Sequence, residues 1–295
     1  MNILSIQSHV AYGHVGNSAV VLPLQRLGHV VWPVHTATLS NHGGYPDHGG
    51  RAVPAGDLAE VIDALDRRGA LSRCDGVLSG YLGDAASGDV VLDAVARVQK
   101  YNNAALYCCD PVMGDDGAVY VADDIPRFMH DRAAPLADVL TPNLFELALL
   151  TDNPPDVLAG APLDEIIAVA KNLVAPDRRT STVLITSLSH TSLPPTDVAM
   201  AAVTADGAWL VGTPKVMFET SPLGPPHGAG DCCAALFCAA LLAGNTAAAA
   251  LSRTAGAIFA LLDETARRGG SELVLVEAQD VMLAPPQKFS AESLT

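Results

Sequence analysis

The segment His227-Gly228-Ala229-Gly230-Asp231 stands directly before the apolar run Cys232–Ala243 and is the most informative stretch of the chain. Glycines permit a tight backbone turn, and the first N–H groups of a helix are unpaired and carry partial positive charge. The pattern predicts a helix over Asp231–Leu242 whose start binds an anion such as a phosphate group. One helix start contributes only about 0.3–2 kcal/mol toward an anion, so it would not neutralise a polyphosphate alone.

Asp231 has two interpretations at this level. Its ordinary pKa of about 3.9 leaves it ionised at neutral pH, so its carboxylate can accept a proton from an attacking hydroxyl group. It can equally be the N-cap of the helix after a glycine-rich turn. The local pattern favours neither interpretation.

Outward from this segment, short apolar runs alternate with helical patterns. The predicted strands are Ile3–Gln7, Val30–His35, Gly76–Ser79, Leu106–Cys109, Val139–Thr141, Thr182–Thr186, the hairpin Val198–Val203 with Ala208–Val211, and Glu272–Val276. The predicted helices include Asn17–Leu27, Asp89–Tyr101, Leu163–Val174 and Thr246–Leu262. This alternation predicts one α/β domain over residues 1–295 with a mostly parallel sheet. Ligands of such sheets bind beyond the carboxyl ends of the strands.

Three further segments place polar residues and glycines just after a predicted strand. Asp110 and Asp115 flank a Gly turn and can hold Mg²⁺ near phosphates, although Asp-Pro and Gly-Asp also favour plain turns. Asn143 and Glu146 lie three residues apart, which indicates a capping box and is compatible with a water-bridged metal. The third segment, residues 8–17, is long and polar, which suits a ligand-binding loop.

Composition excludes several classes of partner. The chain has 17 basic and 32 acidic residues, a net charge of −15, which argues against nucleic acids and anionic membranes. Its longest apolar run is far shorter than the roughly 20 residues of a membrane span, and its first residues do not resemble a signal peptide. The six cysteines form no C-x-x-C pair, so we expect buried thiols in a reducing cytoplasmic compartment.

Together these segments resemble the pyridoxal kinase family of the ribokinase-like superfamily, over nearly the whole chain. The matching pieces are Ser8-His9-Val10 with Gly16-Asn17, Ser40-Asn41-His42 with Tyr45, Ser79-Gly80-Tyr81, Asp110-Pro111-Val112-Met113-Gly114-Asp115, Thr141-Pro142-Asn143 with Glu146, and Gly228-x-Gly230-Asp231. The last motif marks only the superfamily. The segments Ser8-His9-Val10 and Ser40-Asn41-His42 mark the pyridoxal kinase branch.

The resemblance implies a three-layer sandwich that transfers the γ-phosphoryl group of ATP to a hydroxymethyl group, with Mg²⁺, as a homodimer. It leaves a monovalent cation requirement open. On the substrate side it implies Ser8, Val15, His42, Gly43 and Tyr81, with Asp231 as the base and Gly228, Ala229 and Gly230 as the anion hole. On the ATP side it implies Asp110, Asn143, Glu146, Thr186, Ser187, Gly228 and Gly230, with Asp110, Asp115 and Glu146 around the metal. Lys215 is the only Lys or Arg in the Pro-rich segment Thr213–Pro226, which we expect to cover the nucleotide, and is a further candidate for phosphate contact.

The chain also departs from the family pattern. Gly43 stands where the family usually has Thr, which removes a hydroxyl group and is expected to loosen the loop together with Gly44. Ala229 supplies no side-chain oxygen to the anion hole, and His227 is either a phosphate contact or a passive loop residue. Two alternatives to a pyridoxal kinase therefore stay open. One is a kinase for hydroxymethylpyrimidine or a similar heterocycle, and the other is a vitamin B6-binding protein that transfers little phosphate.

Overall fold

The centre of the protein is a ten-stranded sheet with the order β12-β11-β10-β9-β8-β5-β4-β1-β2-β3. The computed structural model describes residues 1–115, 117–174, 179–189, 193–218 and 224–294. The strands of the sheet are β1 (Asn2–Val10), β2 (Val30–Leu39), β3 (Gly50–Ala52), β4 (Gly76–Ser79), β5 (Leu106–Cys109), β8 (Val139–Leu140), β9 (Thr182–Leu188), β10 (Asp197–Thr204), β11 (Gly207–Pro214) and β12 (Glu292–Ser293). A separate small sheet pairs β6 (Gly114–Asp115) with β7 (Ala118–Val119).

The middle of the large sheet is parallel and its two margins are antiparallel. Strands β2, β1, β4, β5, β8 and β9 pair in parallel, in that order. Strands β10, β11 and β12 continue one margin antiparallel, and β3 adds to the other. The mostly parallel sheet is thereby confirmed. Because parallel strands share a direction, their carboxyl ends lie along one edge, where the polar segments follow.

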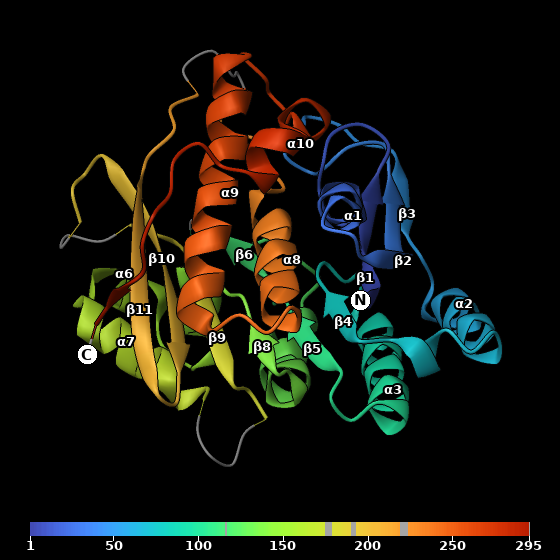
Figure 1. The fold of residues 1–295 in the computed structure, drawn as a ribbon. Helices are drawn as coiled ribbons and strands as arrows, with labels where there is room; N and C mark the ends of the chain where they lie inside the picture. Colours follow the sequence, from blue (N-terminus) through green and yellow to red (C-terminus); the bar gives the residue numbers. More distant parts are fainter. Residues whose placement is uncertain (116, 175–178, 190–192, 219–223, 295) are drawn as a thin grey trace.

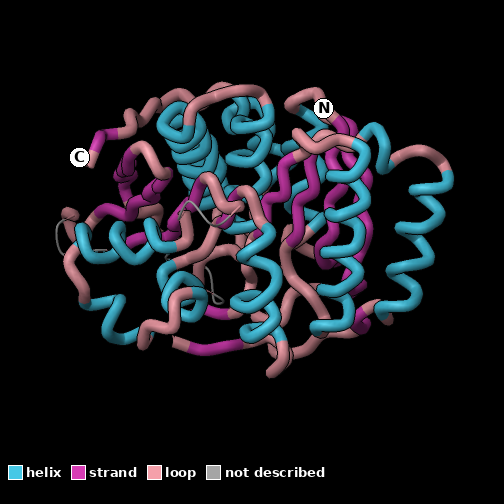
Figure 2. The backbone as a smooth tube through the Cα atoms, turned by 90° about the horizontal axis from the view of Figure 1, so that it is seen from below, coloured by secondary structure: helices cyan, strands magenta, loops and turns pink. Residues whose placement is uncertain are grey.

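Helices cover both faces of the sheet (Figures 1 and 2). They are α1 (Asn17–Arg26), α2 (Ala55–Arg67), α3 (Ala85–Tyr101), α4 (Ile125–Phe128), α5 (Leu144–Leu150), α6 (Pro155–Gly160), α7 (Leu163–Asn172), α8 (Ala229–Leu242), α9 (Ala247–Arg267) and α10 (Leu275–Leu283). Short 3₁₀ or π turns occupy Leu71–Arg73, Met129–Ala133 and Ala134–Leu136. Figure 1 shows α8 and α9 side by side in front of the strands.

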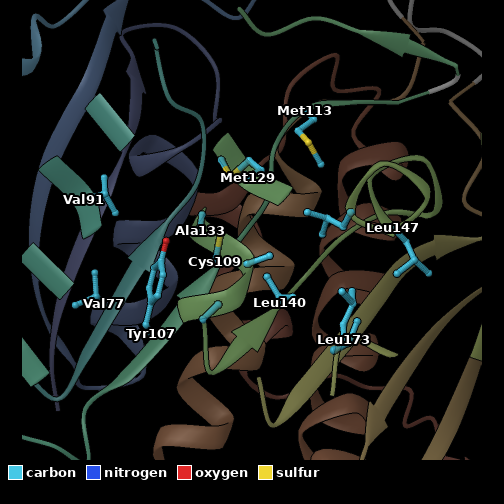
Figure 3. Packing of buried hydrophobic residues seen from close by; sticks show 14 of the residues in the cluster. Val77, Val91, Tyr107, Cys109, Met113, Met129, Ala133, Leu140, Leu147 and Leu173 are labelled. Atoms are coloured by element: carbon cyan, nitrogen blue, oxygen red, sulfur yellow. The ribbon is translucent and has the colours of Figure 1, made fainter. Parts of the chain in front are cut away.

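Successive strand residues point to opposite faces, and both faces are apolar. Leu4, Cys109 and Leu140 belong to the core under α2, α3, α5 and α7, part of which is drawn in Figure 3. Ile3, Cys108 and Val139, one residue away in each strand, belong to the second core under α1, α8, α9 and α10. Two cores on one sheet make the three-layer sandwich that the resemblance implies.

Most predicted elements are confirmed, and one is wrong. The bounds of β4 and β5 are as predicted, and the hairpin of β10 and β11 turns at Ala205-Asp206. The strand predicted over Glu272–Val276 does not form, because the residues from Leu275 onward begin α10 and Glu272 lies in the preceding loop.

All six cysteines are buried and free. Within the described ranges, no helix has the length and hydropathy to cross a membrane.

Candidate active site

The start of α8 lies against the loop after β1, which we call loop A (residues 11–16). Gly228 is the residue before the helix and has φ +92°, a left-handed conformation that favours glycine. A Cβ atom at Gly228 would overlap the backbone carbonyl oxygen of His14. Two segments more than two hundred residues apart in sequence therefore meet here with no room for a side chain.

Asp231 is the third residue of α8, in its first turn, and it does not cap the helix. The residue in the cap position is Gly228, so the N-cap interpretation is wrong. Burial raises the pKa of the Asp231 carboxyl from 3.8 to about 6, while hydrogen bonds from the backbone N–H groups of Gly16 and of Asp231 itself lower it. A carboxylate with a pKa just below neutrality is a better proton acceptor than an ordinary aspartate and still ionised at pH 7.

Asp110 follows β5 and is buried, with 7% of its surface exposed. Burial is the main cause that raises the pKa of this carboxyl to about 7, and the charge of Asp231 adds to it. The hydroxyl of Thr141 donates to Asp110 Oδ1 at 2.8 Å, and this hydrogen bond lowers the pKa of Asp110. Asp231 is thus close enough to Asp110 for its charge to raise the pKa of the Asp110 carboxyl.

Glu146 is the second buried carboxylate on this edge. Its Oε1 accepts the N–H of Met113 at 3.0 Å, and its Oε2 accepts the N–H of Asn143 at 2.9 Å. Asn143 Oδ1 accepts the N–H of Glu146 in return, so the predicted capping box is confirmed. Burial, followed by the charge of Asp110, raises the pKa of Glu146 well above its usual range. The box fixes Glu146 against the turn that carries Asp110.

The donor set suits Mg²⁺, and the predicted role of Asp115 beside Asp110 and Glu146 stays a prediction. Among the residues that the structure describes, no group of three or more His, Cys, Asp or Glu side chains is gathered to hold a metal. Asp115 is exposed on β6, while Asp110 and Glu146 are buried. Mg²⁺ typically binds through one or two carboxylates together with substrate phosphates and water. Two buried carboxylates with raised pKa values fit such an ion.

Replacing Asp110 by asparagine should stabilise the metal-free protein at pH 8 by at least about 1 kcal/mol, because it removes a buried charge and its repulsion of Asp231. The folded pKa of about 7 exceeds 3.8, so the folded state binds more protons than the unfolded chain between about pH 4 and pH 7. The burial of Asp110 therefore costs stability progressively as the pH rises through that window. Urea unfolding at pH 5 and pH 8 measures the gain, which should be smaller at pH 5 than at pH 8. An equal gain at both pH values would contradict the buried charge.

The predicted ATP-side residues Thr186 and Ser187 lie together at the end of β9. They line a cavity of about 100 Å³ together with Ala229 and Gly230 of α8 and Ile258 of α9. The strand-end residue Asn143 pairs with Thr186 and donates from its amide to the carbonyl of Gly114 at 2.8 Å. The cavity thus joins the strand end to the helix start, as a nucleotide site requires.

Lys215 is exposed beyond the end of β11, and its two neighbours Pro214 and Val216 line the cavity. Its backbone N–H donates to the carbonyl of Thr196 at 2.7 Å. The expected cover over Thr213–Pro226 includes residues 219–223, which lie outside the described residues. The phosphate role of Lys215 therefore stays a prediction.

Of the predicted substrate residues, the structure brings Ser8 close to Asp231, through Gly16. Ser8 is buried near the end of β1, Val15 is half-buried in loop A, and Tyr81 is half-buried after β4. Gly16 packs on Ser8 so closely that a Cβ atom would overlap the carbonyl of Ser8. Ser8, Gly16 and Asp231 are therefore neighbours in space, since Gly16 also donates to the Asp231 carboxylate.

The loop after β2, which we call loop B (residues 40–49), is not loose, although Gly43 and Gly44 led us to expect it. Asn41 Nδ2 donates to the carbonyl of Asp47 at 2.8 Å, and the N–H of Gly49 donates to Ser40 Oγ at 2.7 Å. Gly43 is exposed, and a Cβ atom there would meet nothing within 4 Å, so the space for the family's threonine is open. His42 is buried beneath it.

Sequence reasoning missed Glu272, which lies between α9 and α10 and contacts both loops. It also gave no role to the Thr141 hydroxyl. Thr141 stood inside a recognised motif and could have been found from it. Glu272 was assigned to a strand, and no local pattern distinguished it.

Comparison with known proteins agrees with this geometry. A family model described as phosphomethylpyrimidine kinase matches residues 60–272. Over 98% of this chain and 96% of its own length, a protein named pyridoxal kinase PdxY from Rubrobacter xylanophilus is 49% identical. A protein of the same name from Corynebacterium diphtheriae is 43% identical over the full length of both chains.

Solved structures show the same relationship. Pyridoxal kinase from Leishmania donovani, in complex with ADP and pyridoxamine, superposes with a TM-score of 0.88 at 28% identity, covering 100% of this chain and 99% of the other. A putative phosphomethylpyrimidine kinase from Bacteroides thetaiotaomicron has a TM-score of 0.84 at 25% identity, over 99% and 97% of the two chains. By sequence and by fold, the chain belongs to the pyridoxal kinases, within the phosphomethylpyrimidine kinase family.

Proposed function

We propose that this protein is an ATP-dependent pyridoxal kinase, which transfers the γ-phosphoryl group of ATP to the 5′-hydroxymethyl group of pyridoxal, pyridoxine or pyridoxamine. The observation that carries the proposal is the position of Asp231. It lies in the first turn of α8, next to Gly16 of loop A and close to Ser8 of β1, while Ala229 and Gly230 of the same turn line the cavity of Thr186. The full-length relatives carry the same name, and the Leishmania structures hold ADP with pyridoxamine or pyridoxine.

The residues of this chain supply orientation and charge. Phosphoryl transfer passes through a loose transition state, so positioning and electrostatic stabilisation contribute more than covalent chemistry. The first N–H groups of α8 lie where a transferring phosphoryl group can be held, and Asp231 accepts the proton of the attacking hydroxyl late in the step. Mg²⁺ held by Asp110 and Glu146 would neutralise phosphate charge, which an acidic chain with few cations requires.

A second candidate acceptor is hydroxymethylpyrimidine, favoured by the open space at Gly43 and by the family model. Steady-state assays of pyridoxal and hydroxymethylpyrimidine with Mg²⁺-ATP compare the two directly. We expect kcat/KM for pyridoxal to exceed that for the pyrimidine by at least about tenfold, the usual value of one well-placed contact. Preferential turnover of the pyrimidine would reverse the assignment. Tight vitamin B6 binding without ATP consumption would instead identify a binding protein.

The proposal extends to the assembly and the compartment. The homodimer is supported by the family resemblance and is measured by light scattering of the purified protein. A cytoplasmic location is supported by six free, buried thiols, which suit a reducing compartment, and by the dependence on ATP.

A further inference from the structure

Glu272 connects the two loops on the acceptor side of the site. Its side chain is 12% exposed. Oε1 accepts the hydroxyl of Tyr45 at 2.7 Å and lies 3.1 Å from His42 Nε2, both in loop B. Oε2 accepts the backbone N–H of His14, in loop A, at 3.3 Å. One carboxylate therefore binds loop A with one oxygen and loop B with the other.

The hydrogen bonds also fix the tautomer of the His42 ring. The backbone N–H of Gly44 can only donate, and it donates to His42 Nδ1 at 3.1 Å. Nδ1 is then an acceptor, so the ring proton sits on Nε2 and is donated to Glu272. Three donors converge on the carboxylate, which as an ion accepts at both oxygens. Among the described residues, no lysine or arginine forms an ion pair with Glu272, so these three hydrogen bonds are what stabilise its carboxylate.

The backbone of loop A is shaped around this carboxylate. Gly13 has φ +86°, and a Cβ atom there would overlap the Glu272 carboxylate. Next to it, the carbonyl of His14 packs on Gly228 at the start of α8. On the other side, the ring of His42 contacts the ring of His227, the neighbour of Gly228, at a tilted angle of 38°, with 4.2 Å between ring centroids. Both loops that Glu272 binds therefore also contact the turn at His227 and Gly228, which precedes α8.

We propose that Glu272 is a positioning residue for the acceptor, holding loops A and B together in the form that binds the vitamin. This inference rests on the proposed function, since Val15 of loop A and His42 and Gly43 of loop B are the acceptor-side candidates. Glu272 does not line the cavity of Thr186 and Gly230, so we expect it to affect acceptor binding more than ATP binding.

Glu272→Gln is the sharpest test because it keeps the shape and removes one acceptor oxygen. The amide NH₂ must face one of the three donors, so at least one loop is released. We expect KM for pyridoxal to rise by about tenfold, because the loops then occupy the binding form only part of the time. The value of kcat should stay within about threefold and KM for ATP within about twofold, since Asp231 and the nucleotide cavity are untouched. The exposed Glu60 on α2 provides the control, and Glu60→Gln should change none of these values.

Two further measurements keep the inference falsifiable. Tyr45→Phe removes the hydroxyl that donates to Glu272 and keeps the aromatic ring. This variant tests the inference if Glu272→Gln does not fold. It should raise KM for pyridoxal by about threefold, and its effect should be largely lost in the Glu272→Gln background, because the two groups share one interaction. The inference would be overturned if Glu272→Gln changed KM for pyridoxal and KM for ATP equally. It would also be overturned if the effects of Glu272→Gln and Tyr45→Phe on KM for pyridoxal were additive.

Calorimetry of pyridoxal binding without ATP separates this inference from the proposed function. If Glu272 positions the loops, the Kd of pyridoxal rises in Glu272→Gln by the same factor as KM. If the wild-type protein does not bind pyridoxal, the proposed function fails, and the comparison is then made with hydroxymethylpyrimidine. An unchanged Kd for the acceptor that wild-type protein does bind would overturn the role of Glu272.

Discussion

Replacing Asp231 by asparagine should lower kcat for pyridoxal phosphorylation by about 10²–10⁴-fold, which corresponds to about 3–5 kcal/mol of transition-state stabilisation. Asparagine keeps the size of the side chain and cannot accept the proton. The affinity for ATP should stay within about twofold, because Asp231 is not among the residues that line the cavity of Thr186 and Gly230. Single-turnover kinetics and ATP titration measure the two quantities separately.

The pH dependence of the wild-type enzyme provides an independent check of the same role. Burial raises the pKa of Asp231 to about 6, so kcat/KM should fall about tenfold per pH unit below that value. Asp206 in the β10–β11 turn is exposed and serves as the matched control, since Asp206→Asn should retain wild-type turnover. Normal turnover in Asp231→Asn would refute the role of the base.

Replacing Gly228 by alanine should lower kcat/KM by about 100-fold and the free energy of unfolding by about 1–3 kcal/mol. The cause is local. Gly228 has φ +92°, and the new methyl group would overlap the carbonyl oxygen of His14. Either loop A or the start of α8 must move, and both adjoin Asp231. Steady-state kinetics and urea unfolding measure the two effects.

Gly230→Ala is the matched control for stability. Gly230 lies inside α8, and a Cβ atom there would meet nothing within 4 Å. Alanine in a helix is more favourable than glycine by about 0.5–1 kcal/mol, so this variant should be as stable as the wild type or more stable. A Gly228→Ala protein as stable as Gly230→Ala would show that loop A does not constrain the helix start.

The regular elements of this fold could be predicted from sequence because their signals are local. Strands β4 and β5 are short apolar runs between turns, and their bounds are those predicted. The capping box of Asn143 and Glu146 is also a local pattern, and the structure confirms it. The three-layer arrangement is what the family resemblance implies, and the structure confirms it with an apolar core on each face of the sheet.

The features that could not be predicted depend on contacts between distant segments. Asp231 was ambiguous because only the φ angle of Gly228 and the position of loop A show that the helix begins before it. The pKa of Asp110 depends on its burial and on Asp231, more than a hundred residues away. Glu272 was placed in a strand because its apolar neighbours fit one, and its partners in loops A and B are far off in sequence.

The central claim is that this chain moves the γ-phosphoryl group of ATP to the 5′-hydroxymethyl group of pyridoxal. Mass spectrometry of a reaction with Mg²⁺-ATP and pyridoxal, together with a measurement of ADP, tests it most directly. The account predicts pyridoxal 5′-phosphate and ADP in equal amounts, with neither formed by Asp231→Asn on the same timescale. ADP without a phosphorylated vitamin, or no reaction with pyridoxal while hydroxymethylpyrimidine is phosphorylated, would contradict it.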